Sequence, residues 1–307
     1  MERIVDIATD GRHLSAHRGF LIVSEERAEV GRVPLDDIAA VIVHAHGVSW
    51  TTNLVVALAE RGALLVLCAR NHAPVAVCQP LDGHHAQNAR IRAQWEAGKP
   101  LMKQVWKQII VAKIHWQKAV LEAFGHRHDA FDLLARKVGS GDPANIEAQA
   151  ARRYWPLLMG TDFRRDREAE GINAMLNYGY TVVRAIVARA VVAAGLHPSI
   201  GVHHAHRGNA LALADDLMEP FRPLVDALTL TLCRQDICSV TPPAKLAYAR
   251  LTTLDLPQNT VTTTVSGAAQ KVAQSLAACF ESGQSSNLIL PIPPPSAQLT
   301  GLDGLLP

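Results

Sequence analysis

The chain has 307 residues, of which 49% are hydrophobic and 19% charged, so its apolar content is sufficient for a sizeable buried core. It contains no uninterrupted apolar run of about twenty residues, and its start, MERIVDIATDGRHL, lacks the apolar stretch of a secretory signal. We therefore expect a cytoplasmic protein without a membrane span. The five scattered cysteines are expected to stay reduced, without disulfides or a cysteine zinc site.

The first 80 residues are predicted to form a small β-rich domain. Short β-branched segments alternate with turns that contain Asp, Gly or Pro; these segments are RIVDI, GFLIVS, ERAEVGRV and DIAAVIVHA, followed by ALLVLCA and VAVCQP. One helix interrupts them at TTNLVVALAERG, with Thr51 or Thr52 as its N-cap and Gly62 as its stop. The pattern predicts a sheet domain over residues 1–80 with one helix packed against it.

From about residue 85 onward the hydrophobic periodicity becomes helical. Gly98 and Pro100 end one helix and open the next. In that next helix apolar residues recur at three- and four-residue spacing, at Val105, Ile109, Ala112, Trp116 and Val120. Further helical patterns cover residues 144–159, 172–195, 207–218, 221–235 and 264–281.

The predicted fold class is therefore α+β, with the small β-rich N-terminal domain followed by a larger all-helical domain over residues 81–285. Residues 286–307 contain PIPPPSAQ and little apolar periodicity, so we expect them to form a disordered, proline-rich tail.

The first of three segments that could carry chemistry is NIEAQAARRYW. Asn145 is placed to cap a helix, which puts Glu147 in the first turn and Arg152 and Arg153 about one and a half turns later. Taken alone, the segment favours a simple interpretation: a glutamate in a favourable helix dipole beside a solvated arginine pair.

The second segment is GLHPSIGVHHAHRGN, in which His203, His204 and His206 lie on a connection between helices. Histidines on a loop before a helix are common metal ligands, although exposed polar histidines are commoner still. Three closely placed imidazoles could also bind zinc, so a zinc hydrolase remains an alternative even though HExxH is missing.

The third segment is ALALADDLMEPFRP, which contains Asp215, Asp216 and Glu219. Pro220 must break or kink the apolar helix, so we expect the Glu219 carboxylate to project from a helix break. Acidic residues at a helix C-terminus oppose the helix dipole, so a compensating cation is expected, either Arg222 or a bound metal. Together the three segments offer carboxylates and an imidazole, which suit Mg²⁺ or Mn²⁺ and phosphodiester chemistry.

Three stretches carry a resemblance to a known family: NIEAQAARRYW, then NAMLNYGYTVVRAIVARAVVAAGLHPSIGVHH, then NALALADDLMEPFRPLVD. In this order they resemble the CRISPR-associated spacer-acquisition integrase family, often called Cas-one, and most closely its type II form. The resemblance covers most of residues 1–285. It implies a metal-dependent DNA endonuclease and integrase of adaptive antiviral defence. Such proteins insert short foreign DNA duplexes into a repeat array by transesterification.

The resemblance also implies roles and partners. The metal ligands would be Glu147, His204 and Glu219, and Asp216 would be a further catalytic or second-metal residue. A register shift of one residue would replace His204 by His203. The metal would be Mg²⁺ or Mn²⁺, and residues 81–285 would be the catalytic domain. The partners would be double-stranded DNA, a second copy bound through residues 1–80, and a small companion protein of the same adaptation operon.

Net charge is +2, which neither indicates nor excludes nucleic acid, so the placement of charge decides. Lys103, Lys107 and Lys118 fall within roughly a 60° sector of the helix over residues 101–124. An arginine-rich group near Glu147 comprises Arg152, Arg153, Arg164, Arg165 and Arg167. These cations are candidates for contacts to the DNA backbone rather than to bases. A solvated helix face and a catalytically inert DNA-binding scaffold remain the alternatives.

Overall fold

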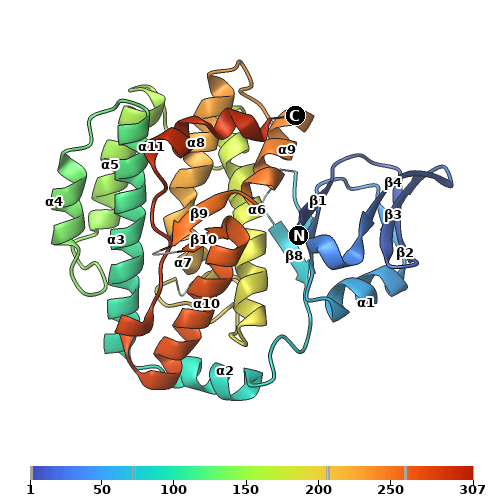
Figure 1. Ribbon diagram of the computed structural model, residues 1–307, viewed down its shortest axis with the longest axis horizontal. Helices are drawn as coiled ribbons and strands as arrows, with labels where there is room; N and C mark the ends of the chain where they lie inside the picture. Colours follow the sequence, from blue (N-terminus) through green and yellow to red (C-terminus); the bar gives the residue numbers. More distant parts are fainter. Residues whose placement is uncertain are drawn as a thin grey trace.

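The computed structural model describes residues 3–70, 72, 74–204, 206, 208–258 and 261–306. Strands dominate the N-terminal part, which is blue in Figure 1, and helices dominate the remainder. This confirms the α+β fold class with a β-rich beginning. The domain boundary at residue 80 stays a prediction.

Two four-stranded sheets form the N-terminal part. The first has the order β1-β5-β7-β8 and contains β1 (Arg3–Ile7), β5 (Ile38–Val43), β7 (Leu64–Cys68) and β8 (Pro74–Cys78). The second has the order β4-β3-β2-β6 and contains β2 (Arg12–His17), β3 (Phe20–Glu25), β4 (Ala28–Pro34) and β6 (Ser49–Trp50). The short helix η1 (Leu35–Asp37) connects β4 to β5, and helix α1 (Thr52–Glu60) connects β6 to β7. The Thr51 side chain accepts a hydrogen bond from Leu54 N, so Thr51 rather than Thr52 is the N-cap of α1.

The first sheet joins the β-rich part to the helices. All six residues of β5 are buried, because both faces of this parallel strand are covered. Val41 and Val43 face a core shared with α1 and the second sheet. Ala40 and Ile42 face the core of the helical part. Side chains of β5 therefore pack into two different cores. This packing holds the first sheet against the helices.

The helical part begins with a short helix, and a long helix follows. Its elements are α2 (Gln87–Glu96), α3 (Lys99–Ala123), α4 (Ala130–Lys137), α5 (Ile146–Met159), α6 (Ile172–Ala193), α7 (Ala212–Met218), η2 (Glu219–Phe221), α8 (Arg222–Cys233), α9 (Pro242–Leu251), α10 (Val265–Ser282), η3 (Ser285–Asn287), α11 (Ser296–Thr300) and η4 (Leu302–Leu305). The predicted helices correspond to α3, α5, α6, α7, α8 and α10. Within the described ranges, no helix is long and apolar enough to cross a membrane.

The prediction that this part is all-helical is wrong in one respect. Strands β9 (Asp255–Gln258) and β10 (Val261–Thr264) pair antiparallel between α9 and α10. The threonines of β10 suit a strand, but a run of four residues is too short to give a clear period. The helix predicted from residue 207 begins at Ala212, and Arg207 itself lies outside the described residues.

The C-terminal residues are ordered, so the predicted disordered tail is wrong for residues 286–306; Pro307 lies outside the described residues. Leu288, Leu299 and Leu302 are buried in the helical core. In addition, Trp116 Nε1 donates a hydrogen bond to the Pro291 carbonyl at 2.9 Å. Figure 1 shows this segment in red beside α3 and α8. The leucines are irregularly spaced, and such docking gives no periodic signal.

Candidate metal centre

Glu147 is positioned by a well-capped first turn of α5. Asn145 adopts a left-handed conformation, with φ of 50°, and its side chain accepts a hydrogen bond from Ala148 N. The carboxylate of Asp142 accepts hydrogen bonds from Ile146 N and Glu147 N, at 2.8 and 3.0 Å. The predicted N-cap is therefore confirmed. From this fixed turn the Glu147 side chain extends to α3, where Lys113 Nζ lies 2.6 Å from Glu147 Oε1.

Glu219 lies where α7 passes into η2 and α8. Its backbone dihedrals are helical, with φ of −53° and ψ of −42°, so the expected departure of Glu219 from helical geometry is wrong. The expected break is present, because α7 ends at Met218 and η2 begins at Glu219. Pro220 sits in the first turn of η2, where a missing N–H leaves no intrahelical bond unmade. The carboxylate is buried, with Arg222 Nε 2.7 Å from Oε1 and Lys113 Nζ 2.5 Å from Oε2. The Oε2 atom accepts no well-directed hydrogen bond.

The charges around Glu219 keep it ionised. Burial alone would raise the pKa of this carboxyl, but the guanidinium of Arg222 and the ammonium of Lys113 outweigh burial and hold the pKa at about 2. Burial would likewise lower the pKa of Lys113, but Glu219 and Glu147 raise it above its ordinary value. Two carboxylates, Glu147 and Glu219, therefore meet two cations, Lys113 and Arg222, in a partly to fully buried group of the helical part.

Lys113 is the member of this group that the sequence interpretation missed. The candidate lysines, Lys103, Lys107 and Lys118, were chosen because they share the polar side of the helix. Lys113 instead interrupts the apolar side, four residues after Ile109. That lone charge on an apolar face was the available signal, because a lysine is seldom buried unless it is paired.

His204 is oriented by Asp216 of α7. The fully buried Asp216 carboxylate accepts hydrogen bonds from the backbone N–H groups of Val202, His203 and His204, and from His204 Nδ1 at 2.5 Å. The hydrogen bond to Asp216 raises the pKa of His204, and Glu219 contributes to the same shift. Because Nδ1 is engaged, Nε2 is the ring nitrogen left for a ligand, the arrangement of many metal-bound histidines.

The close approach of this loop to Asp216 requires a glycine. A Cβ atom at Gly201 would lie 2.4 Å from the His204 carbonyl oxygen and 2.9 Å from Asp216 Oδ2. The GVHH motif therefore reflects packing around one buried carboxylate. Its role is to hold the imidazole of His204 in place.

The other histidines and Asp215 have different surroundings. The His203 ring stacks on Trp106 of α3, with centroids 4.2 Å apart and an interplanar angle of 2°. His206 is exposed. Asp215 is engaged by Arg184 Nε at 2.6 Å and by the Asn209 amide at 2.7 Å. In the part of the chain that the structure describes, no three His, Cys, Asp or Glu side chains are already arranged around an ion position.

The donor set nevertheless fits a hard divalent cation. Glu147 and Glu219 both contact one ammonium group, and His204 is near enough to Glu219 for that carboxylate to affect its pKa. The buried Oε2 of Glu219 has spare acceptor capacity. Two carboxylates and one imidazole are ligands that Mg²⁺ and Mn²⁺ accept.

Asp226 is a buried acid near Arg222 and is bound by a tyrosine. Asp226 of α8 accepts a hydrogen bond from the Tyr180 hydroxyl, and Arg222 lies over the Tyr180 ring, 4.7 Å from its centroid. Burial raises the pKa of Asp226 to about 7, although hydrogen bonds to the carboxylate oppose the shift. The NYGY segment thus supports the guanidinium that binds Glu219.

The candidate DNA-binding cations differ in availability. Arg152, Arg153 and Lys103 are exposed. Arg165 is half-buried and donates hydrogen bonds to Asn173 and Asn177 of α6, at 2.9 and 2.6 Å. Lys118 is paired with Asp132 at 2.7 Å. The intramolecular contacts of Arg165 and Lys118 make them weaker candidates than the exposed residues.

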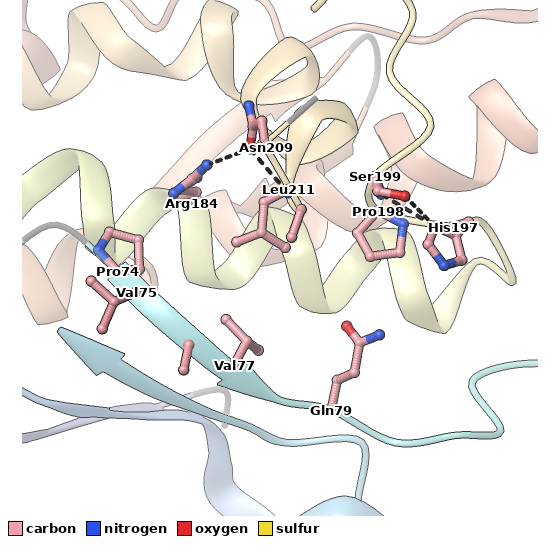
Figure 2. A pocket seen from close by; sticks show the side chains of 13 residues that line it. Pro74, Val75, Val77, Gln79, Arg184, His197, Pro198, Ser199, Asn209 and Leu211 are labelled. Atoms are coloured by element: carbon pink, nitrogen blue, oxygen red, sulfur yellow. Dashed lines mark hydrogen bonds between the residues drawn. The ribbon is translucent and has the colours of Figure 1, made fainter. Parts of the chain in front are cut away.

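A cavity of about 480 Å³ lies apart from these residues, between β8 and the two ends of the loop that carries His204. Figure 2 shows Pro74, Val75 and Val77 on its β8 side and Arg184, Asn209 and Leu211 across from them. His197 and Ser199, which hydrogen-bond to each other, line it at the start of the loop. None of Glu147, His204, Asp216 or Glu219 lines this cavity.

The architecture is shared with solved structures of other proteins. A structure described as a casposase bound to integration product matches with a TM-score of 0.78 at 20% identity, over 92% of this chain and 91% of that one. A chain of a Cas6-RT-Cas1–Cas2 complex matches with a TM-score of 0.75 at 19% identity, over 94% of this chain and 36% of that one. At these identities the matches establish the fold, which is that of Cas1 and the casposase.

The sequence itself establishes the family. Residues 5–241 match the model for the CRISPR associated protein Cas1. The CRISPR-associated endonuclease Cas1 of Neisseria meningitidis is 38% identical over 228 residues, 74% of each chain. The chain therefore belongs to the Cas1 family of CRISPR-associated proteins. The resemblance that the motifs indicated is confirmed, and a type II-like form is consistent with these matches.

Proposed function

We propose that the protein is a divalent-metal-dependent DNA endonuclease and integrase that inserts short DNA duplexes into a CRISPR repeat array. The observation that carries the proposal is the pair of carboxylates, Glu147 and Glu219, that meet at one buried cation, together with the imidazole of His204 that Asp216 orients. Family membership and a fold shared with a casposase support the reaction class.

Mg²⁺ or Mn²⁺ would be held by Glu147, Glu219 and Nε2 of His204. When bound, the metal would activate a hydroxyl nucleophile and stabilise charge on the phosphodiester. The chain's own residues prepare that site. Asp216 fixes the imidazole tautomer, Arg222 fixes one oxygen of Glu219, and the capped turn at Asn145 fixes Glu147.

In strand transfer the 3′ hydroxyl of the inserted DNA attacks a phosphodiester of the repeat. One P–O bond forms, one breaks, and the departing 3′ oxygen takes up a proton, so the number of phosphodiester bonds is conserved. The exposed Arg152 and Arg153, on the same helix as Glu147, would contact the DNA backbone.

We also propose that the protein acts as a homodimer bound to a small companion protein. The match to a chain of a Cas1–Cas2 complex supports the companion.

The test is strand transfer on a branched DNA substrate, with Mg²⁺ or Mn²⁺ and with a chelator. Wild type should be active only with metal, and Glu147→Gln should lose activity by orders of magnitude. DNA binding by Glu147→Gln in metal-free buffer should equal or slightly exceed that of wild type, because the substitution removes a like-charge repulsion. Full activity of Glu147→Gln would contradict the assignment. Metal-independent binding without any reaction would favour the inert scaffold.

A further inference from the structure

The ammonium group of Lys113 lies between Glu147 and Glu219, where the proposed metal ion would bind. Its side chain is 11% exposed and lies among buried residues of α3, including Ile109, Ile110 and Ile114. Nζ is 2.6 Å from Glu147 Oε1 and 2.5 Å from Glu219 Oε2. Divalent metals bind carboxylate oxygens at roughly 2.0–2.6 Å. The ammonium nitrogen thus lies at nearly coordination distance from one oxygen of each proposed ligand.

The charges of this group balance without a metal. Two carboxylates face two cations, Lys113 and Arg222, and all four side chains are partly or fully buried. A divalent ion added to this group would leave two uncompensated positive charges in a poorly solvated site. Such an excess is unfavourable unless an anion joins it. The anion that the proposed reaction supplies is a DNA phosphate.

The two cations differ in how easily they can move. The planar guanidinium of Arg222 is held by Glu219 Oε1 and by the face of the Tyr180 ring. Lys113 carries its charge on a flexible four-carbon chain, and its polar contacts in the described chain are the two carboxylates. Metal binding would therefore displace the ammonium of Lys113 and leave Arg222 in place.

We propose that Lys113 is a built-in counter-ion that competes with the divalent metal for Glu147 and Glu219 and, once displaced, pairs with a DNA phosphate. This proposal rests on the metal-dependent function proposed above. It makes Lys113 a positioning residue with a regulatory effect: metal affinity is low in the free protein and rises when DNA is bound. A nuclease of this design would bind its metal more tightly when its substrate is present.

The test measures Mn²⁺ affinity by titration calorimetry, with and without a DNA duplex whose 3′ ends are blocked. In wild type, DNA should raise Mn²⁺ affinity by a factor within roughly the 5- to 150-fold range of allosteric couplings. In Lys113→Gln, Mn²⁺ affinity without DNA should rise by a similar factor, and the effect of DNA should shrink. Lys113→Met, which also lacks the charge, should behave in the same way.

Lys245 provides a matched control. It is 15% exposed and paired with the Asp6 carboxylate at 3.4 Å, away from this group. Lys245→Met should leave both Mn²⁺ affinities unchanged. If a Lys113 variant is too unstable for calorimetry, its melting temperature serves instead: Mn²⁺ should raise that temperature more in the variant than in wild type.

The outcomes separate the two proposals. Equal Mn²⁺ affinities in wild type and Lys113→Gln, both abolished by Glu147→Gln, would overturn the role of Lys113 and keep the metal site. Mn²⁺ binding that is indifferent to Glu147→Gln and Glu219→Gln would overturn both proposals. A rise in DNA-free affinity in the Lys113 variants, with no rise in Lys245→Met, is the expected result.

Discussion

The carboxylate of Asp216 lies 2.5 Å from Nδ1 of His204 while it also accepts three backbone N–H groups of the same loop. One buried acid thus fixes the loop conformation and the ring nitrogen that is left free. This relationship makes Asp216 a residue that acts through His204. Its loss should affect the metal site more than a missing surface charge would.

We expect Asp216→Asn to lower Mn²⁺ affinity by about 10- to 100-fold, as for other partners of metal-bound histidines. An amide cannot accept all four hydrogen bonds, so the variant should also lose about 1–3 kcal/mol of unfolding free energy. Calorimetric metal titration and thermal unfolding measure the two effects. Asp215→Asn is the control, because Asp215 binds Arg184 and Asn209 instead. Equal metal affinities in both variants would contradict the role of Asp216.

The C-terminal segment should contribute to stability. Deletion of residues 288–307 would expose the sites of Leu288, Leu299 and Leu302 and leave Trp116 Nε1 without its acceptor. Each buried leucine contributes about 1.5–3 kcal/mol, so the melting temperature should fall by more than about 5 °C. Differential scanning calorimetry measures this. An unchanged melting temperature would mean that the segment does not dock in solution.

Local signals in the sequence predicted much of the site's framework. Asn145 was predicted as the cap before Glu147, because its side chain can bond to its own turn. For α1 the sequence left Thr51 and Thr52 open, and only the structure selects Thr51. Lys113 could not be placed in this way, because its burial depends on carboxylates from α5 and η2, which only the tertiary fold brings to α3. The docked C-terminal leucines are a similar case.

The arginines near Glu147 should differ in how much they contribute to the salt dependence of DNA binding. Replacing Arg152 and Arg153 together by alanine should reduce the slope of log DNA affinity against log salt by about one to two units, because both are exposed. Replacing Arg165 should change the slope less, because it is tied to Asn173 and Asn177. Binding measured by fluorescence anisotropy across salt concentrations tests this. A larger slope change for Arg165 would place the DNA on its side.

Glu219 should make stability depend on pH in the acid range. Its pKa is lowered from 4.5 to about 2 in the folded chain, where Arg222 and Lys113 outweigh the effect of burial. A lowered pKa means that the unfolded chain binds the proton more readily, so this contribution is present above about pH 4.5 and is lost as pH falls through about 2.

We therefore expect metal-free Glu219→Gln to be less stable than wild type at pH 6 by roughly 3–5 kcal/mol, the usual cost of removing one partner of a buried ion pair. The gap should narrow as pH falls from 4.5 towards 2. Urea unfolding at several pH values measures the gap, and Glu281→Gln is the control, because Glu281 pairs with Arg90 at a more exposed position, 45% exposed. That control should show a difference of at most about 1 kcal/mol. The contrary outcome is a stability difference for Glu219→Gln that stays constant from pH 6 to pH 2. It would mean that Glu219 titrates at the same pH in the folded and unfolded chains. The ion pairs with Lys113 and Arg222 would then not account for its charge.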